Sequence, residues 1–173
     1  MGYGTDQHIA LLVQNDKGTW NYFSFNGVPI YDTTKGYLGG GSIDNMGEKS
    51  FANPQAFLDS NYNSYEEHPK HRMSKDEING FCYSEAFVLP TSKMQDAFIK
   101  ETFLRAVKEG YNLFTNHCGH AVQKALNSAG IKTYVETYDL ESHSVVRDYP
   151  YLPGNTFMYI KSNNSGITIY RRR

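Results

Sequence analysis

One stretch constrains the fold of this chain more than any other: a short amphipathic helix that starts near Cys118. Five apolar residues recur there at helical spacing and share one face: Ala121, Val122, Ala125, Leu126 and Ala129. A side-chain oxygen of Thr115 or Asn116 is expected to cap the first turn. Gly130 is a natural residue for the C-terminal end. The pattern therefore predicts a helix that carries Cys118 in its first turn.

The position of Cys118 favours reactivity. Unpaired backbone N–H groups and the positive end of the helix dipole favour an anion in the first turn. A thiol there is expected to lose its proton more easily, which is how cysteines become nucleophiles. The alternative is that Cys118 is a small buried hydrophobic residue, as most lone cysteines are.

The N-terminal part of the chain predicts a β-hairpin over residues 8–26. Asp16-Lys17-Gly18 fits a three-residue loop with Gly18 in the left-handed position. This turn pairs Gln14 with Trp20, Ala10 with Ser24, and His8 with Asn26. Side chains alternate between the faces of a sheet, so His8, Ser24 and Asn26 are expected on one face.

The rest of the chain predicts further elements of both kinds. Helices are expected after Asn53-Pro54 and, with Thr91 or Ser92 as the cap, up to about Glu109. The long helix has roughly periodic apolar positions: Met94, Ala97, Phe98, Phe103, Leu104, Ala106 and Val107. Strands are expected at 80–89 and 131–138, and a C-terminal hairpin should pair 157–160 with 167–170. The glycines of 39–42 predict a flexible loop. The fold expected is α+β: an antiparallel sheet packed against the cysteine helix and the second long helix.

Composition narrows the classes of protein. At 173 residues, the chain fits a single domain over 1–173. A net charge of -1 gives no general case for nucleic acid, and no stretch is apolar enough for stable membrane insertion. The N-terminal residues have no signal-peptide pattern. Two cysteines, Cys82 and Cys118, do not make a disulfide framework, and Cys82 is interpreted as a packing residue of its strand.

A cysteine nucleophile needs a base, and a third polar group usually orients that base. His117 and His120 lie too close to Cys118 along a helix to face it. His8 is the better candidate, because Ser24 or Asn26 could hold its ring. The rival interpretation is a zinc site that uses the His117–His120 stretch with Cys82, His68 and His71. The CxxC and HExxH spacings that make such sites specific are absent from the sequence.

Two segments of the chain resemble the sequences of a known protein family. The segment from His8 to Gly27, with Trp20-x-Tyr22-x-Ser24, is similar to the histidine strand and following strand of circularly permuted papain-like (NlpC/P60-type) cysteine hydrolases. More narrowly, it resembles the C-terminal toxin domains of RHS-repeat polymorphic toxins. The segment from Tyr111 to Cys118, followed by Ala-Leu-x-x-Ala-Gly, is similar to the cysteine helix of that group. Leu89-Pro90-Thr91 and Gln95-Asp96 stand where the family has a strand and a capped helix.

The resemblance implies a permuted papain-like fold and a role for each matching residue. Cys118 would be the nucleophile, His8 the base, and Ser24 or Asn26 the group that orients His8. No metal or other cofactor is implied. His117 stands directly before Cys118 where the family often has asparagine, and neither Ser24 nor Asn26 is an unambiguous match to the third residue.

The expected function is therefore that of a bacterial toxin or effector domain with amidase or peptidase activity. Its substrate would be peptidoglycan peptides or a protein of the target cell, and its partner a cognate immunity protein. It would be delivered without its own signal peptide and act in the target-cell periplasm or cytoplasm. Two alternatives stay open. Cys118-Gly119-His120 also resembles a motif of the lecithin:retinol acyltransferase branch of the same superfamily, which transfers acyl groups on lipids. The other alternative is a binding module without catalysis.

Overall fold

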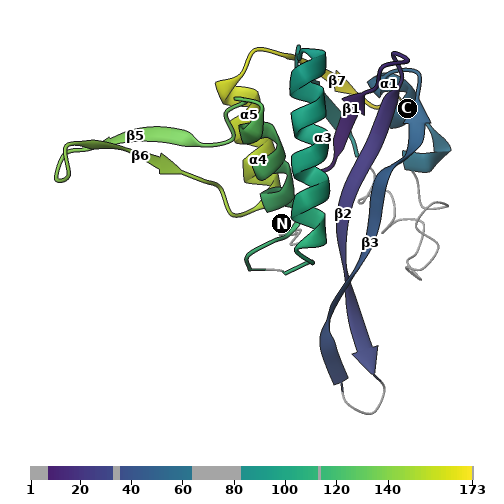
Figure 1. The fold of residues 1–173 in the computed structure, drawn as a ribbon, viewed down its shortest axis with the longest axis horizontal. Coiled ribbons are helices and arrows are strands. Elements are labelled where there is room, and N and C mark those ends of the chain that lie inside the picture. The colour runs from purple at the N-terminus through teal and green to yellow at the C-terminus, as the bar shows by residue number, and fades with distance from the viewer. Residues whose placement is uncertain (1–7, 33–35, 64–82, 113, 173) are drawn as a thin grey trace.

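The computed structural model of the protein describes residues 8–32, 36–63, 83–112 and 114–172, and within 26–45 it describes the backbone only. Helices and strands alternate irregularly along the chain, and the strands pair antiparallel, so the α+β class is confirmed. In chain order (Figure 1) the elements are β1 (Leu11–Gln14), β2 (Trp20–Asp32), β3 (Gly36–Phe51), α1 (Pro54–Leu58), η1 (Asn61–Asn63), β4 (Glu85–Val88), α3 (Lys93–Lys108), α4 (Cys118–Ser128), β5 (Val135–Asp139), β6 (Ser144–Asp148), α5 (Pro153–Asn163) and β7 (Ile167–Tyr170).

The turn between β1 and β2 sets the register that its sequence predicts. Gln14 pairs with Trp20 and Leu11 with Phe23, so the predicted alignment is confirmed along β1. The N–H of Asn15 donates to the carbonyl of Thr19 at 2.8 Å, and Gly18 has φ +79°. A residue with a Cβ is strained at that φ, which is why glycine stands there.

A third strand extends the predicted hairpin into a sheet of order β1-β2-β3. The glycines expected to form a flexible loop lie within β3, where Gly39 pairs with Ile30 and Gly41 with Val28. That prediction is wrong, because β2 continues to Asp32 and supplies a pairing partner along its whole length. The β2–β3 ribbon runs past the end of β1 and projects from the body (Figure 1).

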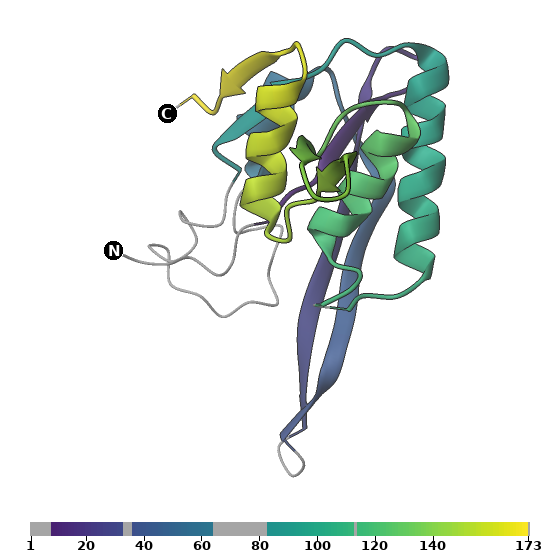
Figure 2. The same cartoon turned by 90° about the vertical axis from the view of Figure 1, so that its left-hand side faces the viewer.

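One face of the sheet packs on helices α3 and α4, as expected. Each helix contacts the other, α3 contacts β1, and α4 contacts β2 (Figure 2). The core between them contains Ile9, Leu11, Val13, Phe23 and Phe25 from the sheet, and Ile99, Phe103, Ala106, Val107, Cys118, Ala121, Val122, Ala125 and Leu126 from the helices. The sequence places Met94 and Phe98 on this face of α3 as well, but they are 68% and 47% exposed.

The opposite face of the sheet packs on α1 and the short β4–β7 sheet. Tyr22 stacks on Phe57, with ring centroids 4.9 Å apart, and Leu58 is fully buried beside them. The cap predicted for α1 is confirmed: the Asn53 side chain accepts the Ala56 N–H at 2.8 Å, and Pro54 follows at the first helical position. This second layer lies on the face that carries Ser24.

The C-terminal hairpin predicted from sequence is wrong. Residues 157–160 lie in helix α5, and β7 pairs instead with β4, Ile169 opposite Ala86. Aromatic and β-branched residues favour a strand locally. Here Thr156 and Ile160, one helical turn apart, are buried, and α5 contacts α4, so tertiary packing decides in favour of the helix.

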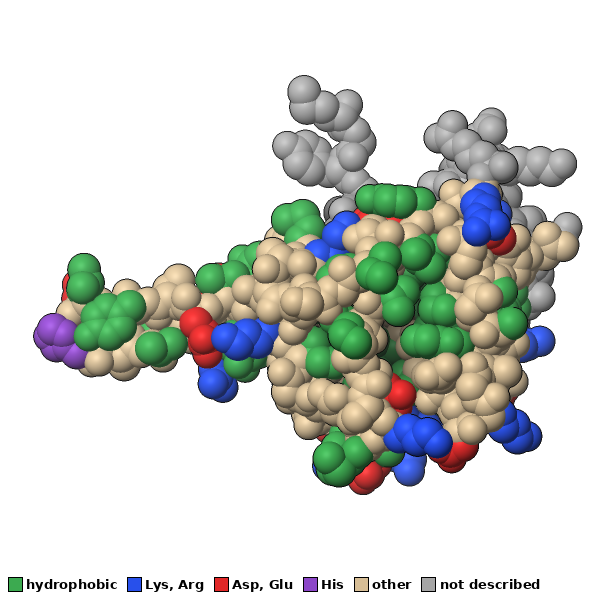
Figure 3. All heavy atoms as spheres, turned by 90° about the horizontal axis from the view of Figure 1, so that it is seen from above, with side chains coloured by type: hydrophobic (Ala, Val, Ile, Leu, Met, Phe, Trp, Pro, Cys, Tyr) green, Lys and Arg blue, Asp and Glu red, His purple; other side chains and the backbone are tan. Residues whose placement is uncertain are grey.

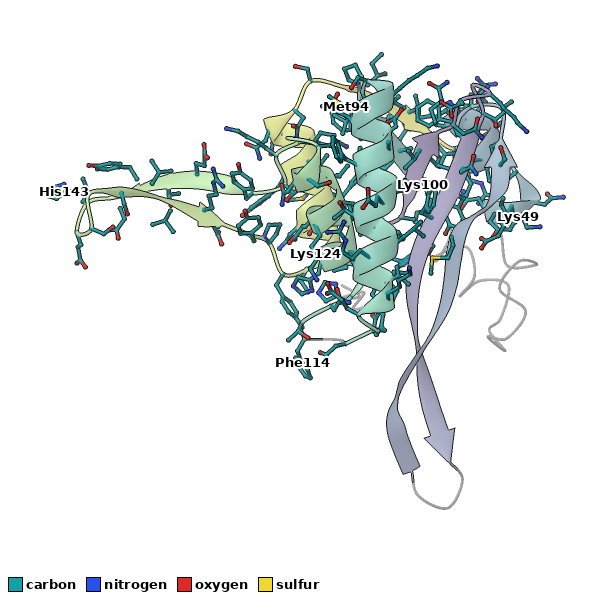
Figure 4. The ribbon with its side chains drawn as sticks, in the orientation of Figure 1. Lys49, Met94, Lys100, Phe114, Lys124 and His143 are labelled. Atoms are coloured by element: carbon teal, nitrogen blue, oxygen red, sulfur yellow. The ribbon has the colours of Figure 1, made fainter. Side chains whose placement is uncertain are left out.

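Strands β5 and β6 form a projecting hairpin, which we call the arm (residues 135–148). Val135 pairs with Asp148 and Asp139 with Ser144, and every residue of β6 is exposed. Figure 3 shows the arm extending from the body, and Figure 4 places His143 at its tip. The predicted strand at 131–138 is thus confirmed in part. Across the described ranges, none of the helices has the length and apolar character needed to cross a membrane.

Candidate catalytic site around Cys118

Helix α4 begins where the sequence predicts, with a different cap. Cys118 is its first residue and His117 is the N-cap: His117 Nδ1 accepts the Gly119 N–H at 3.0 Å. Thr115 and Asn116 do not cap the helix. The Asn116 side chain is buried and donates instead to the carbonyls of Ala106 and Gly110, both at 2.8 Å. This tie anchors the segment before Cys118 to the end of α3.

The C-terminal end of α4 is confirmed at Gly130. Gly130 has φ +77°, and its N–H donates to the Asn127 carbonyl at 3.0 Å. The Ile131 N–H donates to the Leu126 carbonyl, also at 3.0 Å. This pair of bonds satisfies carbonyls that the last turn leaves without helical partners. Both ends of α4 are therefore fixed, and with them the position of Cys118.

The Cys118 thiol is buried, and burial governs its acidity. The residue is 4% exposed and belongs to the core between sheet and helices. Burial raises the pKa of the thiol, while hydrogen bonds from the backbone N–H groups of Ile9, Gly119 and Cys118 itself act in the opposite direction without cancelling it. The expectation of an easily lost proton is thus wrong: at neutral pH the resting group is the thiol. A reaction through sulfur needs a base.

The hydrogen bond from Ile9 brings Cys118 to the strand that carries His8. The N–H that approaches the sulfur belongs to the peptide bond between His8 and Ile9. The two residues are more than a hundred positions apart in sequence, and packing of α4 on the sheet brings them together. The peptide between His8 and Ile9 therefore lies beside the Cys118 sulfur, and a contact between the side chains of Cys118 and His8 stays a prediction.

His8 contacts one of the two partners that the hairpin register places on its face. Its Nε2 lies 2.8 Å from Ser24 Oγ, within hydrogen-bond distance, and Ser24 is fully buried. The predicted contact between His8 and Ser24 is confirmed, and its catalytic role stays a prediction. Asn26 lies in β2 opposite Ile43, and its side chain is outside the described part of the structure.

Two tyrosines that sequence reasoning misses complete the surroundings of Ser24. The hydroxyls of Tyr22 and Tyr83 are 3.1 Å apart, and hydrogen bonds from Ser24 lower the pKa of each, against a larger rise caused by burial. The charge of an ionised Cys118 would raise the pKa of both tyrosines slightly. We call Ser24, Tyr22 and Tyr83 the hydroxyl cluster. Tyr22 carries a local signal, because it shares the face of Ser24; Tyr83 arrives through a long-range contact.

His117 and His120 form a separate aromatic group with Tyr151. The two imidazole centroids are 4.0 Å apart, and the Tyr151 ring lies 5.2 Å from His117 and 5.7 Å from His120. This packing is consistent with the prediction that His117 and His120 do not face the Cys118 thiol. Of the proposed zinc ligands, Cys82, His68 and His71 lie outside the described residues. Within the described ranges, no three His, Cys, Asp or Glu side chains gather as a metal site would require.

The His117 cap makes stability depend on pH. Burial, and then the neighbouring His120, lowers the pKa of His117 to about 4, against an opposing hydrogen bond to the Tyr151 backbone. Between about pH 6.5 and about pH 4, the unfolded chain therefore binds a proton that folded His117 does not, and stability rises with pH through this window. We expect the free energy of unfolding to fall by about 3 kcal/mol as pH drops across it. Urea denaturation at several pH values measures this.

The control for this prediction is His117→Asn. Asparagine caps helices well and does not titrate. The variant should therefore lose the part of the pH dependence that His117 supplies and keep its stability at neutral pH. Equal pH dependence in the two proteins contradicts the assignment.

Comparison with known proteins gives no match: no family model, curated protein or solved structure is similar to the chain.

Proposed function

We propose that this protein is a papain-like cysteine hydrolase that cleaves an amide bond. Cys118 is the nucleophile, His8 the base, and Ser24 the residue that orients His8. One observation carries the proposal: the Cys118 sulfur accepts the N–H of the peptide that joins His8 to Ile9, while the His8 ring is held by Ser24 at 2.8 Å. A nucleophile, a base and an orienting group in this relation are the minimum for thiol catalysis.

Because burial raises the pKa of Cys118, the reaction starts from the thiol. The S–H proton passes to His8 Nδ1 as sulfur attacks the carbonyl carbon, and Nε2–H donates to Ser24 Oγ throughout. The backbone N–H of Cys118 is suited to hold the oxyanion, because that of Gly119 already donates to His117 Nδ1. His8 then returns the proton to the leaving amine, which leaves a thioester. Water hydrolyses the thioester with His8 again as base, and the thiol is restored.

The biological setting comes from the family resemblance. We propose a toxin or effector domain that acts on peptidoglycan peptides or on a protein of the target cell, with a cognate immunity protein that blocks the site. Amide cleavage is preferred over lipid acyl transfer, because His120, which carries the second resemblance, packs on His117 and Tyr151. The alternative of a pure binding module is tested by the Cys118→Ala variant.

The experiment is expression of three proteins in bacterial cytoplasm and, with an export signal, in periplasm: wild type, Cys118→Ala and His8→Ala. We expect wild type to kill in one compartment and neither variant to kill in either. Killing in the periplasm with release of peptidoglycan fragments indicates a cell-wall amidase, and killing in the cytoplasm indicates a protein substrate. Killing by Cys118→Ala points to a binding module and contradicts the proposal. Absence of killing by wild type in both compartments contradicts the toxin assignment.

A further inference from the structure

We infer that Tyr83 is a positioning residue for His8: its ring packs on the imidazole, and its hydroxyl, with that of Tyr22, holds the Ser24 hydroxyl that bonds His8. The inference rests on the proposed function, because it assigns a role to Tyr83 within the pair of Cys118 and His8. Tyr83 lies next to β4, on the layer that covers the second face of the sheet.

The contact between the two rings restricts the imidazole. Ring centroids of His8 and Tyr83 are 5.9 Å apart with planes tilted by 47°. Ser24 contacts Nε2 at 2.8 Å. With only one of these contacts, the imidazole ring can still rotate. The hydrogen bond at Nε2 and the ring contact together restrict both torsions of the histidine side chain.

The hydroxyl cluster offers the Ser24 proton an acceptor other than the His8 ring. A serine hydroxyl has one proton to donate and two lone pairs to accept with. Ser24 hydrogen-bonds Tyr22 and Tyr83 as well as His8. When the Ser24 proton is directed to a tyrosine oxygen, a lone pair of Ser24 is left for His8 Nε2–H. The proton of the imidazole is then fixed on Nε2, and Nδ1 is the nitrogen that accepts from the thiol.

Tyr83 is itself anchored by a buried asparagine. Asn63 is 4% exposed; its Oδ1 accepts the Tyr83 N–H at 2.9 Å, and its Nδ2 donates to the Tyr83 carbonyl at 2.8 Å. The same amide donates to the Leu58 carbonyl at 2.9 Å. One side chain thus ties both backbone groups of Tyr83 to the end of α1. The Tyr83 ring is therefore held from its backbone as well as from its hydroxyl.

The test is the pH profile of Cys118 alkylation by iodoacetamide, read by mass spectrometry on the peptide that contains Cys118. In wild type, the rate should rise through an apparent pKa lower than that of His8→Ala, where the thiol ionises without assistance. Tyr83→Leu should move the profile towards that of His8→Ala, with a rate near pH 6.5 about tenfold below wild type. Its rate at high pH, where the thiol is ionised in every variant, should equal that of wild type.

A merely structural role of Tyr83 gives a different result, since loosened packing changes the rate at every pH. The matched control is Tyr138→Leu on the arm, where the tyrosine is 59% exposed; it should reproduce the wild-type profile. Coinciding profiles of wild type and His8→Ala refute the proposed function and this inference with it. If those two profiles differ while Tyr83→Leu follows wild type, or lowers the rate equally at all pH values, the inference alone is overturned.

A second variant covers failure of Tyr83→Leu to fold. The double substitution Tyr22→Phe and Tyr83→Phe keeps both rings and removes both hydroxyls. We expect an apparent pKa between those of wild type and His8→Ala, because the ring contact remains and the Ser24 proton has lost its acceptors. A wild-type profile in this folded variant overturns the role of the hydroxyls.

Discussion

Replacing Cys118 by serine is expected to abolish killing while the protein stays folded. Serine keeps the shape of the side chain and still accepts the N–H of Ile9, but its hydroxyl is a far weaker nucleophile than a thiol beside a base. The activity should fall by roughly three orders of magnitude or more. Toxicity is measured as colony survival at matched expression, and stability by urea denaturation.

Serine is a better test than alanine at this position, because Cys118 is also part of the core. Loss of function in Cys118→Ala could arise from a cavity beside Ala121 and Val122 as well as from lost chemistry. For Cys118→Ser we expect the free energy of unfolding to fall by only about 1 kcal/mol, because the new hydroxyl remains hydrogen-bonded. A folded Cys118→Ser protein that still kills contradicts the nucleophile assignment. An unfolded one shows that Cys118 is retained for packing.

Phe103→Ala is expected to have the largest effect on stability. Phe103 is 1% exposed, and its ring meets Phe23 of β2 edge-on, with centroids 6.0 Å apart. It therefore lies where α3 meets the sheet. Truncation of such a ring costs about 4 kcal/mol, much of the stability of a typical domain. Chemical denaturation followed by circular dichroism gives the value.

The matched control is Phe98→Ala, one helical turn and a little more before Phe103 on the same helix. Phe98 is 47% exposed, so its removal should cost less than about 1 kcal/mol. Similar losses in the two variants contradict the assignment of the core to the face of α3 that carries Phe103.

Local rules are sufficient where a short segment fixes its own geometry. Gly18 determines the hairpin register, and that register places Ser24 and Asn26 on the face of His8 as its two candidate partners, of which Ser24 makes the contact. Asn53 is identifiable as a cap for the same reason, and Ser92 is one of two candidates with Thr91. Gly130 marks the end of α4 because the left-handed conformation there favours glycine.

Predictions fail where distant parts of the chain decide. The cap of α4 is His117, because the Asn116 side chain donates to the carbonyls of Ala106 and Gly110. No local sequence pattern indicates these hydrogen bonds. Helix α5 has the local pattern of a strand. It forms a helix because it packs against α4, and that contact is a tertiary property. The helix terminus alone predicts a lowered pKa for Cys118. Burial of the thiol, which the sequence does not show, raises that pKa instead. Tyr83 has no local signal, because Asn63 and Tyr22 hold it from other elements.

The arm has a consequence for how this molecule unfolds. Its strands β5 and β6 hydrogen-bond each other, and β6 buries none of its residues. A two-stranded hairpin is marginally stable in water by itself. Amide hydrogens of the arm should therefore exchange through local opening, while those of α4 exchange only when the core is disrupted. A single two-state unfolding transition then describes the body around Cys118, and the arm opens and closes many times within one lifetime of the native core.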